Sequence, residues 1–242
     1  MLSVYIKEIN AFFSSLIGYL SIIVFLLLTG LFIFVFPDTS LLHQPFATLD
    51  PLFSMAPLIF IFLIPAITMR SLSEEWSNNT FELLATKPLT TIQILAGKYF
   101  AALTLVVFAI LPTLLYYYTI HELGSPRGNL DRGAIMGSYI GLIFLSMVFT
   151  SIGILASSLS RNQIVAFLLA AFLCFFMYYG FFYLSNLPVF VGNWDVFIQS
   201  LGIDYHYASI SRGLVDTRDV VYFLSLSVLF LAIAQYVIDN RK

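Results

Sequence analysis

Six long apolar stretches without a charged residue set the limits on what this chain can fold into. They cover residues 16–36, 52–69, 99–120, 134–157, 163–185 and 220–238. A helix needs roughly 20 apolar residues to cross about 30 Å of hydrocarbon, and each stretch is close to that length. Since the mean hydropathy is +0.94 and only 10% of residues are charged, the chain lacks the polar surface of a water-soluble domain. The sequence therefore predicts an all-α, polytopic membrane protein with six transmembrane helices, folded as one domain over residues 1–242.

The residues before the first stretch predict a short helix that lies in the membrane interface. Val4, Ile6 and Ile9 are apolar, whereas Lys7 and Glu8 between them are charged. Such a two-sided pattern suits an interfacial helix, and a frayed terminus is the alternative. The first stretch is expected to be a retained span, because its apolar core exceeds the roughly 7 to 15 residues of a signal peptide.

Basic residues near the span ends predict the orientation. Six spans place both termini on one side, together with Lys7, Arg70, Lys87, Lys98, Arg161, Arg241 and Lys242, and leave Arg127, Arg132, Arg212 and Arg218 on the other. Lys and Arg are enriched in cytoplasmic loops. Both termini, and the connector of residues 70–98, are therefore expected on the cytoplasmic side of a bacterial inner membrane.

The residues inside the six spans do not indicate catalysis or ion-driven transport. No Asp, Glu, Lys, Arg or His lies inside the six stretches, which argues against a transporter driven by buried carboxylates and against an intramembrane hydrolase. His43, His121 and His206 fall in loops, and no pair has ligand spacing within one loop, so ordinary loop histidines are favoured over an external metal site. Cys174 is alone and is expected to pack as a small apolar residue. No catalytic, cofactor-binding or metal-binding residue is expected.

Two further segments predict how the spans are packed and connected. In the fourth stretch, Gly137 and Gly141 form GxxxG, which lets helices approach closely. Packing within the bundle is the favoured interpretation, and an interface with a second membrane subunit is the alternative. Residues 186–219 are too apolar for a free loop, so they are expected to lie on the outer leaflet or to re-enter the bundle. Within them, residues 204–212 suit a short helix that is stopped by Gly213.

The connector of residues 70–98, RSLSEEWSNNTFELLATKPLTTIQILAGK, carries the polar surface that the spans lack. Its charged residues are Arg70, Glu74, Glu75, Glu82, Lys87 and Lys98. Three pairs fit helix-capping boxes: Ser71 with Glu74, Asn79 with Glu82, and Thr90 with Gln93. They predict two short helices and a turn before the third span, with Pro88 ending what precedes it. A docking surface for a partner is the favoured interpretation, and a loop lying on the lipid surface is the alternative.

Several connector residues form a pattern that is known from a family. They are Glu74, Glu75, Thr80, Glu82, Leu83, Leu84, Thr86, Pro88, Ile94, Leu95, Gly97 and Lys98. This pattern resembles that of type 2 ABC exporter permeases. The family often has Gly where this chain has Asn79, which tolerates the same turn geometry. Residues 210–242 are similar to the last span of the gliding-motility-associated permease subunit GldF and of its copper-maturation relative NosY, and the gliding type is favoured.

The resemblance implies a transport subunit that is not itself an enzyme and that couples ATP hydrolysis by a separate ABC ATPase subunit to export. The chain has no GxxxxGK[ST] motif, so ATP and Mg²⁺ are expected on that partner and no cofactor on this chain. The implied ATPase-coupling segment consists of Glu74, Glu75, Thr80, Phe81, Glu82, Leu83, Leu84, Pro88 and Lys98. A second permease copy or a related permease subunit, and the lipid bilayer, are the other expected partners, and no nucleic acid is expected. A membrane scaffold of a motility or secretion complex that moves no solute is the alternative.

Overall fold

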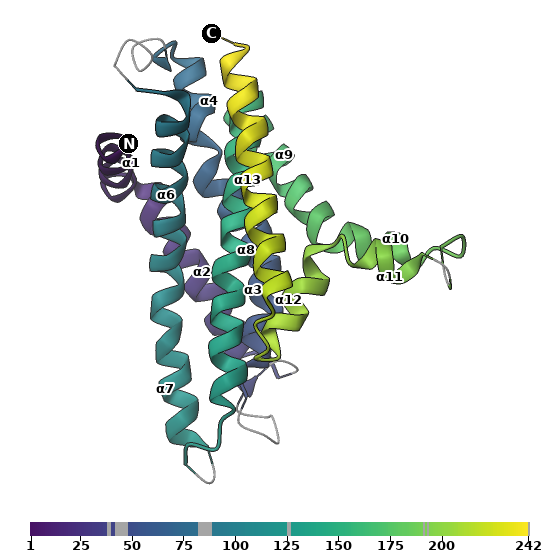
Figure 1. The fold of residues 1–242 in the computed structure, drawn as a ribbon. Coiled ribbons are helices and arrows are strands. Elements are labelled where there is room, and N and C mark those ends of the chain that lie inside the picture. The colour runs from purple at the N-terminus through teal and green to yellow at the C-terminus, as the bar shows by residue number, and fades with distance from the viewer. Residues whose placement is uncertain are drawn as a thin grey trace.

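The long helices of the chain run side by side as a bundle (Figure 1). The computed structural model describes residues 1–37, 40–41, 48–81, 89–124, 127–190, 192 and 194–241, and the regular structure in these ranges is entirely helical. Five helical segments are long and apolar enough to cross a membrane: Asp50–Ser77, Thr91–Leu123, Arg132–Leu159, Gln163–Ser185 and Thr217–Asp239. The first two helices form a sixth if they are counted as one bent span. The predicted all-α membrane fold is confirmed.

Helices α1 (Leu2–Ser14) and α2 (Leu16–Phe34) are separated by a sharp bend of 67°. Ser15 at the break has extended backbone angles, which end the first helix. The bend also needs Gly18, because a Cβ atom there would lie 2.5 Å from the Phe12 carbonyl oxygen. As a result, α1 leaves the bundle axis and packs against α6 (Thr91–Ile110).

Helix α8 (Arg132–Leu159) forms the centre of the bundle. Within its most apolar stretch 78% of residues are buried, against 22% for α13 (Thr217–Asp239). It packs against α3 (Asp50–Thr68), α6, α9 (Gln163–Phe175) and α13. Burial of large side chains such as Phe60 and Phe149, both with no exposed surface, makes α8 and α3 the core of the fold.

Different short helices lie at the two ends of the bundle. We call one the α4 end; it holds α4 (Arg70–Ser77), the start of α6 and the end of α13 (Figure 1). We call the other the α12 end; it holds α7 (Leu114–Leu123), which follows the 3₁₀ turn η2 (Leu111–Thr113), and α12 (Ile203–Ser211).

The fifth span is not a regular α-helix over its whole length. Helix α9 continues through a π-helical turn, η3 (Phe176–Gly180), into α10 (Phe181–Ser185). Helices α10 and α11 (Asp195–Gln199) pack together and project sideways from the bundle (Figure 1). The chain then returns as α12, which packs against α8 and ends before Gly213 with a φ of +86°, as the sequence predicted.

Candidate functional site

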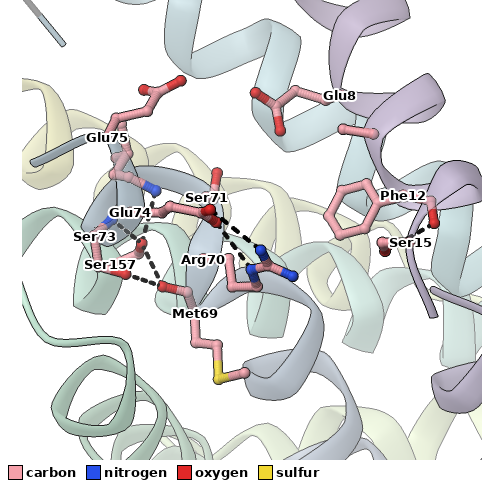
Figure 2. A network of polar contacts seen from close by, with 12 residues as sticks. Glu8, Phe12, Ser15, Met69, Arg70, Ser71, Ser73, Glu74, Glu75 and Ser157 are labelled. Carbon is pink, nitrogen blue, oxygen red and sulfur yellow. Dashed lines mark hydrogen bonds and ion pairs between the residues drawn. The ribbon is translucent and has the colours of Figure 1, made fainter. Parts of the chain in front are cut away.

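The start of the predicted connector is a helical joint rather than a capped turn. Met69 has helical angles (φ −54°, ψ −34°), so α3 runs on into α4 with no extended residue between them. Helix α4 begins at Arg70 and has no side-chain cap. The predicted capping box of Ser71 and Glu74 is therefore wrong, because Ser71 lies inside the first turn. Glu74 instead pairs with Arg70, one turn earlier, at 2.9 Å (Figure 2).

Ser157 of α8 supplies the acceptor that the start of α4 lacks. Its hydroxyl oxygen accepts hydrogen bonds from the backbone N–H groups of Leu72 at 2.8 Å and Ser73 at 3.0 Å. The same hydroxyl donates to the Met69 carbonyl at 3.0 Å (Figure 2). Unpaired N–H groups at a helix start must find a partner when they are buried. A distant helix thus performs the capping that local sequence does not.

Close packing of α8 against the joint depends on a glycine one turn before Ser157. A Cβ atom on Gly153 would lie 2.0 Å from the Thr68 hydroxyl oxygen at the end of α3. Leu72 on α4 is completely buried beside this contact. Helix α8 therefore holds both sides of the α3–α4 joint.

Four charged residues, Lys7, Glu8, Glu75 and Lys98, form an ion cluster at the α4 end. The Lys98 side chain is only 1% exposed, and its Nζ donates to Glu8 at 2.7 Å, Glu75 at 2.9 Å and the Ser71 carbonyl at 2.6 Å. These three bonds use all the protons of the ammonium group. Lys7, with a side chain that is 56% exposed, contacts Glu75 at 3.2 Å. The cluster is neutral and ties α1, α4 and α6 together.

A cavity of about 270 Å³ lies beside the ion cluster, between α1 and α4. Its walls include Phe12 and Ser15 from the end of α1, and Arg70 and Glu74 from α4 (Figure 2). Among the described residues, Glu75 Oε2 is buried without a hydrogen-bond partner. All four residues of the ion cluster also line the cavity, so the cluster forms part of its wall.

A residue that follows α13, Arg241, contacts an aromatic pair at the end of α4. Trp76 and Phe81 stack with ring centroids 4.4 Å apart. The Arg241 guanidinium lies 5.8 Å from the Trp76 ring and donates to the carbonyls of Ser158 at 2.8 Å and Leu159 at 2.6 Å. Arg241 thus ties the last residues of α8 to the α4 aromatic pair.

The structure describes five of the nine predicted coupling residues. The five are Glu74, Glu75, Thr80, Phe81 and Lys98; Glu82, Leu83, Leu84 and Pro88 lie outside the described residues. The ion cluster brings Glu75 and Lys98 together, whereas Glu74 faces Arg70 and Phe81 is buried against Trp76. Thr80 is exposed. The predicted cap of Asn79 and Glu82 cannot be followed fully, because Glu82 lies outside the described residues. The capping box of Thr90 and Gln93 at the start of α6 is confirmed.

Residues 39–238 match the model of a family described as ABC-2 family transporter protein. The chain belongs to this family. A search of the curated proteins found no match. The permease is thus a multi-pass membrane protein and a subunit of an ABC transporter, a type of subunit that lacks the ATPase and works with a separate ABC ATPase subunit. The matched region includes α4 and Lys98 but starts after α1, so Lys7 and Glu8 lie outside it.

Sequence reasoning missed two residues of the permease that complete this site, Glu8 and Ser157. A signal for Glu8 was present. Because the Thr90 cap starts α6, Lys98 must lie about two turns inside an apolar helix, where an ammonium needs carboxylate partners. Ser157 gave no such signal, since its partners lie more than 80 residues away in the sequence.

The two glycines of the GxxxG pattern lie at the other end of α8. A Cβ atom on Gly137 would be 2.7 Å from Gly213 Cα, and one on Gly141 would be 3.3 Å from the Tyr207 ring. Both glycines therefore face α12 of the same chain. Among the described residues, no group of three or more His, Cys, Asp or Glu is arranged to hold a metal ion.

Proposed function

We propose that the α4 end of the permease is the seat of the ABC ATPase subunit and that α4 passes the closure of that subunit to the bundle. The ion cluster carries this proposal. The cluster bonds α4 to α1 and α6, and Ser157 bonds α4 to α8. A movement of α4 would therefore be transmitted to three helices. Such rigid-body transmission is a common way to convert a local contact into a larger movement. ATP and Mg²⁺ would bind to the partner subunit and no cofactor to this chain.

We further propose that the α4 end faces the cytoplasm of a bacterial inner membrane. Arg161, in the turn between α8 and α9, and Arg241 lie at this end together with Lys7, Arg70 and Lys98. The opposite end carries Arg127, Arg132, Arg212 and Arg218. Basic residues favour the cytoplasmic side, and lysines occur only in the first of these two groups.

A second permease copy or a related permease subunit would complete the transport path. The spans Gln163–Ser185 and Thr217–Asp239 support this part of the proposal, since only 28% and 22% of the residues in their most apolar stretches are buried within one chain. Their exposed apolar residues can contact lipid or a second subunit. Crosslinking between two differently tagged copies would distinguish a homodimer from a pair with a related subunit.

Within the family, we propose a role in the gliding-motility system. The support is the similarity of residues 210–242 to the last span of the gliding-type subunit. Copper-site maturation of the NosY type is the second candidate, supported by the same residues. Deletion of the gene would abolish surface gliding in the first case, and would leave a copper enzyme without its metal in the second.

A single-cysteine experiment tests the seat of the ATPase. Cys174 is the chain's one cysteine and is buried, so Cys174→Ala gives a clean background. Ser77→Cys, exposed at the end of α4, is expected to crosslink to the ATPase subunit in the assembled transporter. Thr217→Cys, exposed at the α12 end, is the matched control and is expected not to crosslink. Crosslinking from Thr217→Cys alone would place the ATPase at the wrong end and overturn the proposal.

A second experiment separates coupling from scaffolding. Glu82→Ala with Leu84→Lys is expected to abolish ATPase association and transport while the permease still reaches the membrane. An unchanged association would contradict the coupling assignment. If a catalytically dead ATPase still supports function, the scaffold alternative is correct, because a transporter requires hydrolysis.

A further inference from the structure

A second cavity, of about 580 Å³, opens at the α12 end of the bundle. It lies between the starts of α3 and α8, the π-helical turn η3 and helix α12. Its lining combines three tyrosines, Tyr178, Tyr179 and Tyr207, with three charged residues, Asp50, Asp204 and Arg212. π-Helical turns occur frequently at functional sites, and this one delivers two consecutive tyrosines to the cavity.

The aromatic wall of the cavity is held by several contacts. The Tyr207 hydroxyl donates to the Phe53 carbonyl of α3 at 2.8 Å, and its ring packs 6.2 Å from that of Tyr178. Tyr178 meets Tyr179 edge to face with centroids 4.6 Å apart. The absence of a side chain at Gly141 leaves room for the Tyr207 ring against α8. These contacts hold the Tyr178 and Tyr207 rings in place beside the cavity.

Helix α12, which carries Asp204 of the cavity lining, is held in place by contacts with α8 and α13. The Ser138 hydroxyl of α8 donates to the Ser211 carbonyl at 3.0 Å. On the other side, His206 lies 2.7 Å from the buried Asp219 of α13 and stacks on Tyr222 at 3.8 Å. The cavity is thus preformed by contacts that do not involve its charged lining.

Asp204 is the charged group set between the tyrosines. It is partly buried and, among the described residues, forms no ion pair with a basic side chain. Burial raises the pKa of this carboxyl, and hydrogen bonding with the Tyr178 hydroxyl partly offsets the rise. Asp50 and Arg212 are exposed, and the Arg212 Nε is engaged with the Ala208 carbonyl. The three charged residues of the lining sum to one negative charge.

We propose that this cavity binds an ammonium group, held by the Asp204 carboxylate and the aromatic rings of Tyr178, Tyr179 and Tyr207 that line it. A partly desolvated carboxylate attracts a cation more strongly than an exposed one. Aromatic rings add a cation–π attraction that a neutral ligand cannot gain. The ammonium can belong to a small amine or to the headgroup of a lipid such as phosphatidylethanolamine. Binding at this site requires neither ATP hydrolysis nor the ATPase subunit. It can therefore be tested separately from the proposed coupling role.

Calorimetric titration of the full-length permease in detergent tests the proposal, with choline and ethanolamine as probes. Neohexanol, the uncharged isostere of choline, is the matched ligand control. We expect choline or ethanolamine to bind, neohexanol to bind at least about tenfold more weakly, and Asp204→Asn to weaken amine binding by a similar factor. Asp195→Asn, the same change on α11 outside the cavity, is expected to leave binding unchanged.

A lipid arm distinguishes the two sources of the ammonium group. The permease is placed in nanodiscs of phosphatidylglycerol with or without phosphatidylethanolamine, and retained lipid is counted by native mass spectrometry. Retention of phosphatidylethanolamine that is lost in Asp204→Asn, without binding of free amines, identifies a headgroup site. If neohexanol binds as well as choline, or if neither free amine nor lipid depends on Asp204, the proposal is overturned. Tyr178→Phe, which keeps the ring, should retain binding, whereas Tyr178→Leu should reduce it.

Discussion

Replacing Lys98 by methionine should destabilise the permease far more than the same change at Lys7. Both residues are lysines of the ion cluster, but the Lys98 side chain is 1% exposed and that of Lys7 is 56% exposed. Methionine keeps much of the lysine's length and packing, so the main loss is the charge. Without Lys98, the carboxylates of Glu8 and Glu75, with side chains 13% and 11% exposed, face each other with only the exposed Lys7 nearby.

The size of the effect follows from this difference in burial. Removing one partner of a buried, hydrogen-bonded ion pair costs about 3–5 kcal/mol, because a charge is left without compensation. An exposed pair contributes about 0–1 kcal/mol. We therefore expect Lys98→Met to lower the free energy of unfolding by about 3 kcal/mol more than Lys7→Met. Removing the charges of Glu8 and Glu75 as well, by Glu→Gln changes in the Lys98→Met background, should recover part of the loss.

Unfolding by sodium dodecyl sulfate in mixed micelles, followed by tryptophan fluorescence, measures these differences. The chain has two tryptophans, Trp76 in α4 and Trp194 before α11. In a Trp194→Phe background the signal reports on Trp76 alone, which stacks on Phe81 near the ion cluster. Each variant is compared with this background at the same micelle composition.

Two results would refute the reasoning. Equal losses for Lys98→Met and Lys7→Met would mean that the cluster is solvated like a surface pair. A triple variant less stable than Lys98→Met would mean that packing or hydrogen bonding, and not unpaired charge, accounts for the cost.

Three further predictions follow from individual contacts. Ser157→Ala should lower the free energy of unfolding by about 1–3 kcal/mol because it leaves buried N–H groups of α4 unpaired, whereas Ser14→Ala, at an exposed hydroxyl, should have little effect; similar losses for both would contradict the capping role. Thr90→Ala should cost about 1 kcal/mol through loss of the capping box, measured in the same titration, and no loss would show that packing alone fixes the start of α6. Choline affinity should rise as the pH increases through the raised pKa of Asp204, because only the ionised carboxylate attracts the ammonium, and a flat calorimetric profile through this range would contradict that role. The other charged or titratable groups of the cavity are Asp50, Arg212 and the tyrosines Tyr178, Tyr179 and Tyr207.

The features that the sequence predicted correctly are those governed by local physics. Bilayer thickness fixes the length of an apolar run, so most spans could be placed to within a few residues. The exceptions are the third span, whose helix α6 begins at Thr91 rather than at residue 99, and the bend between α1 and α2. Capping boxes involve residues three apart, and the pair of Thr90 and Gln93 forms as predicted. The stop after α12 likewise depends on one residue, Gly213, whose positive φ suits glycine.

The features that the sequence could not predict depend on partners far along the chain. Ser71 and Glu74 fit a capping pattern, but α3 continues through Met69 and leaves the pattern inside a helix. The true acceptor is Ser157, on another helix. Likewise, Lys98 was assigned to the connector, whereas its role follows from Glu8, 90 residues earlier. Tertiary packing of α1 and α8 decides both outcomes.

Helix α8 physically joins the two ends of the permease. Its 28 residues span about 42 Å as a continuous helix, and small residues at each end allow another element to approach its backbone. Gly153 and Ser157 hold the α3–α4 joint, while Gly137 and Gly141 hold α12, which forms a wall of the Asp204 cavity. A movement of α4 relative to α8 must break the hydrogen bonds of Ser157, whereas a movement of α4 together with α8 carries α12 with it. The stability lost in Ser157→Ala therefore also measures how firmly the proposed ATPase seat is bonded to the helix that shapes the opposite end.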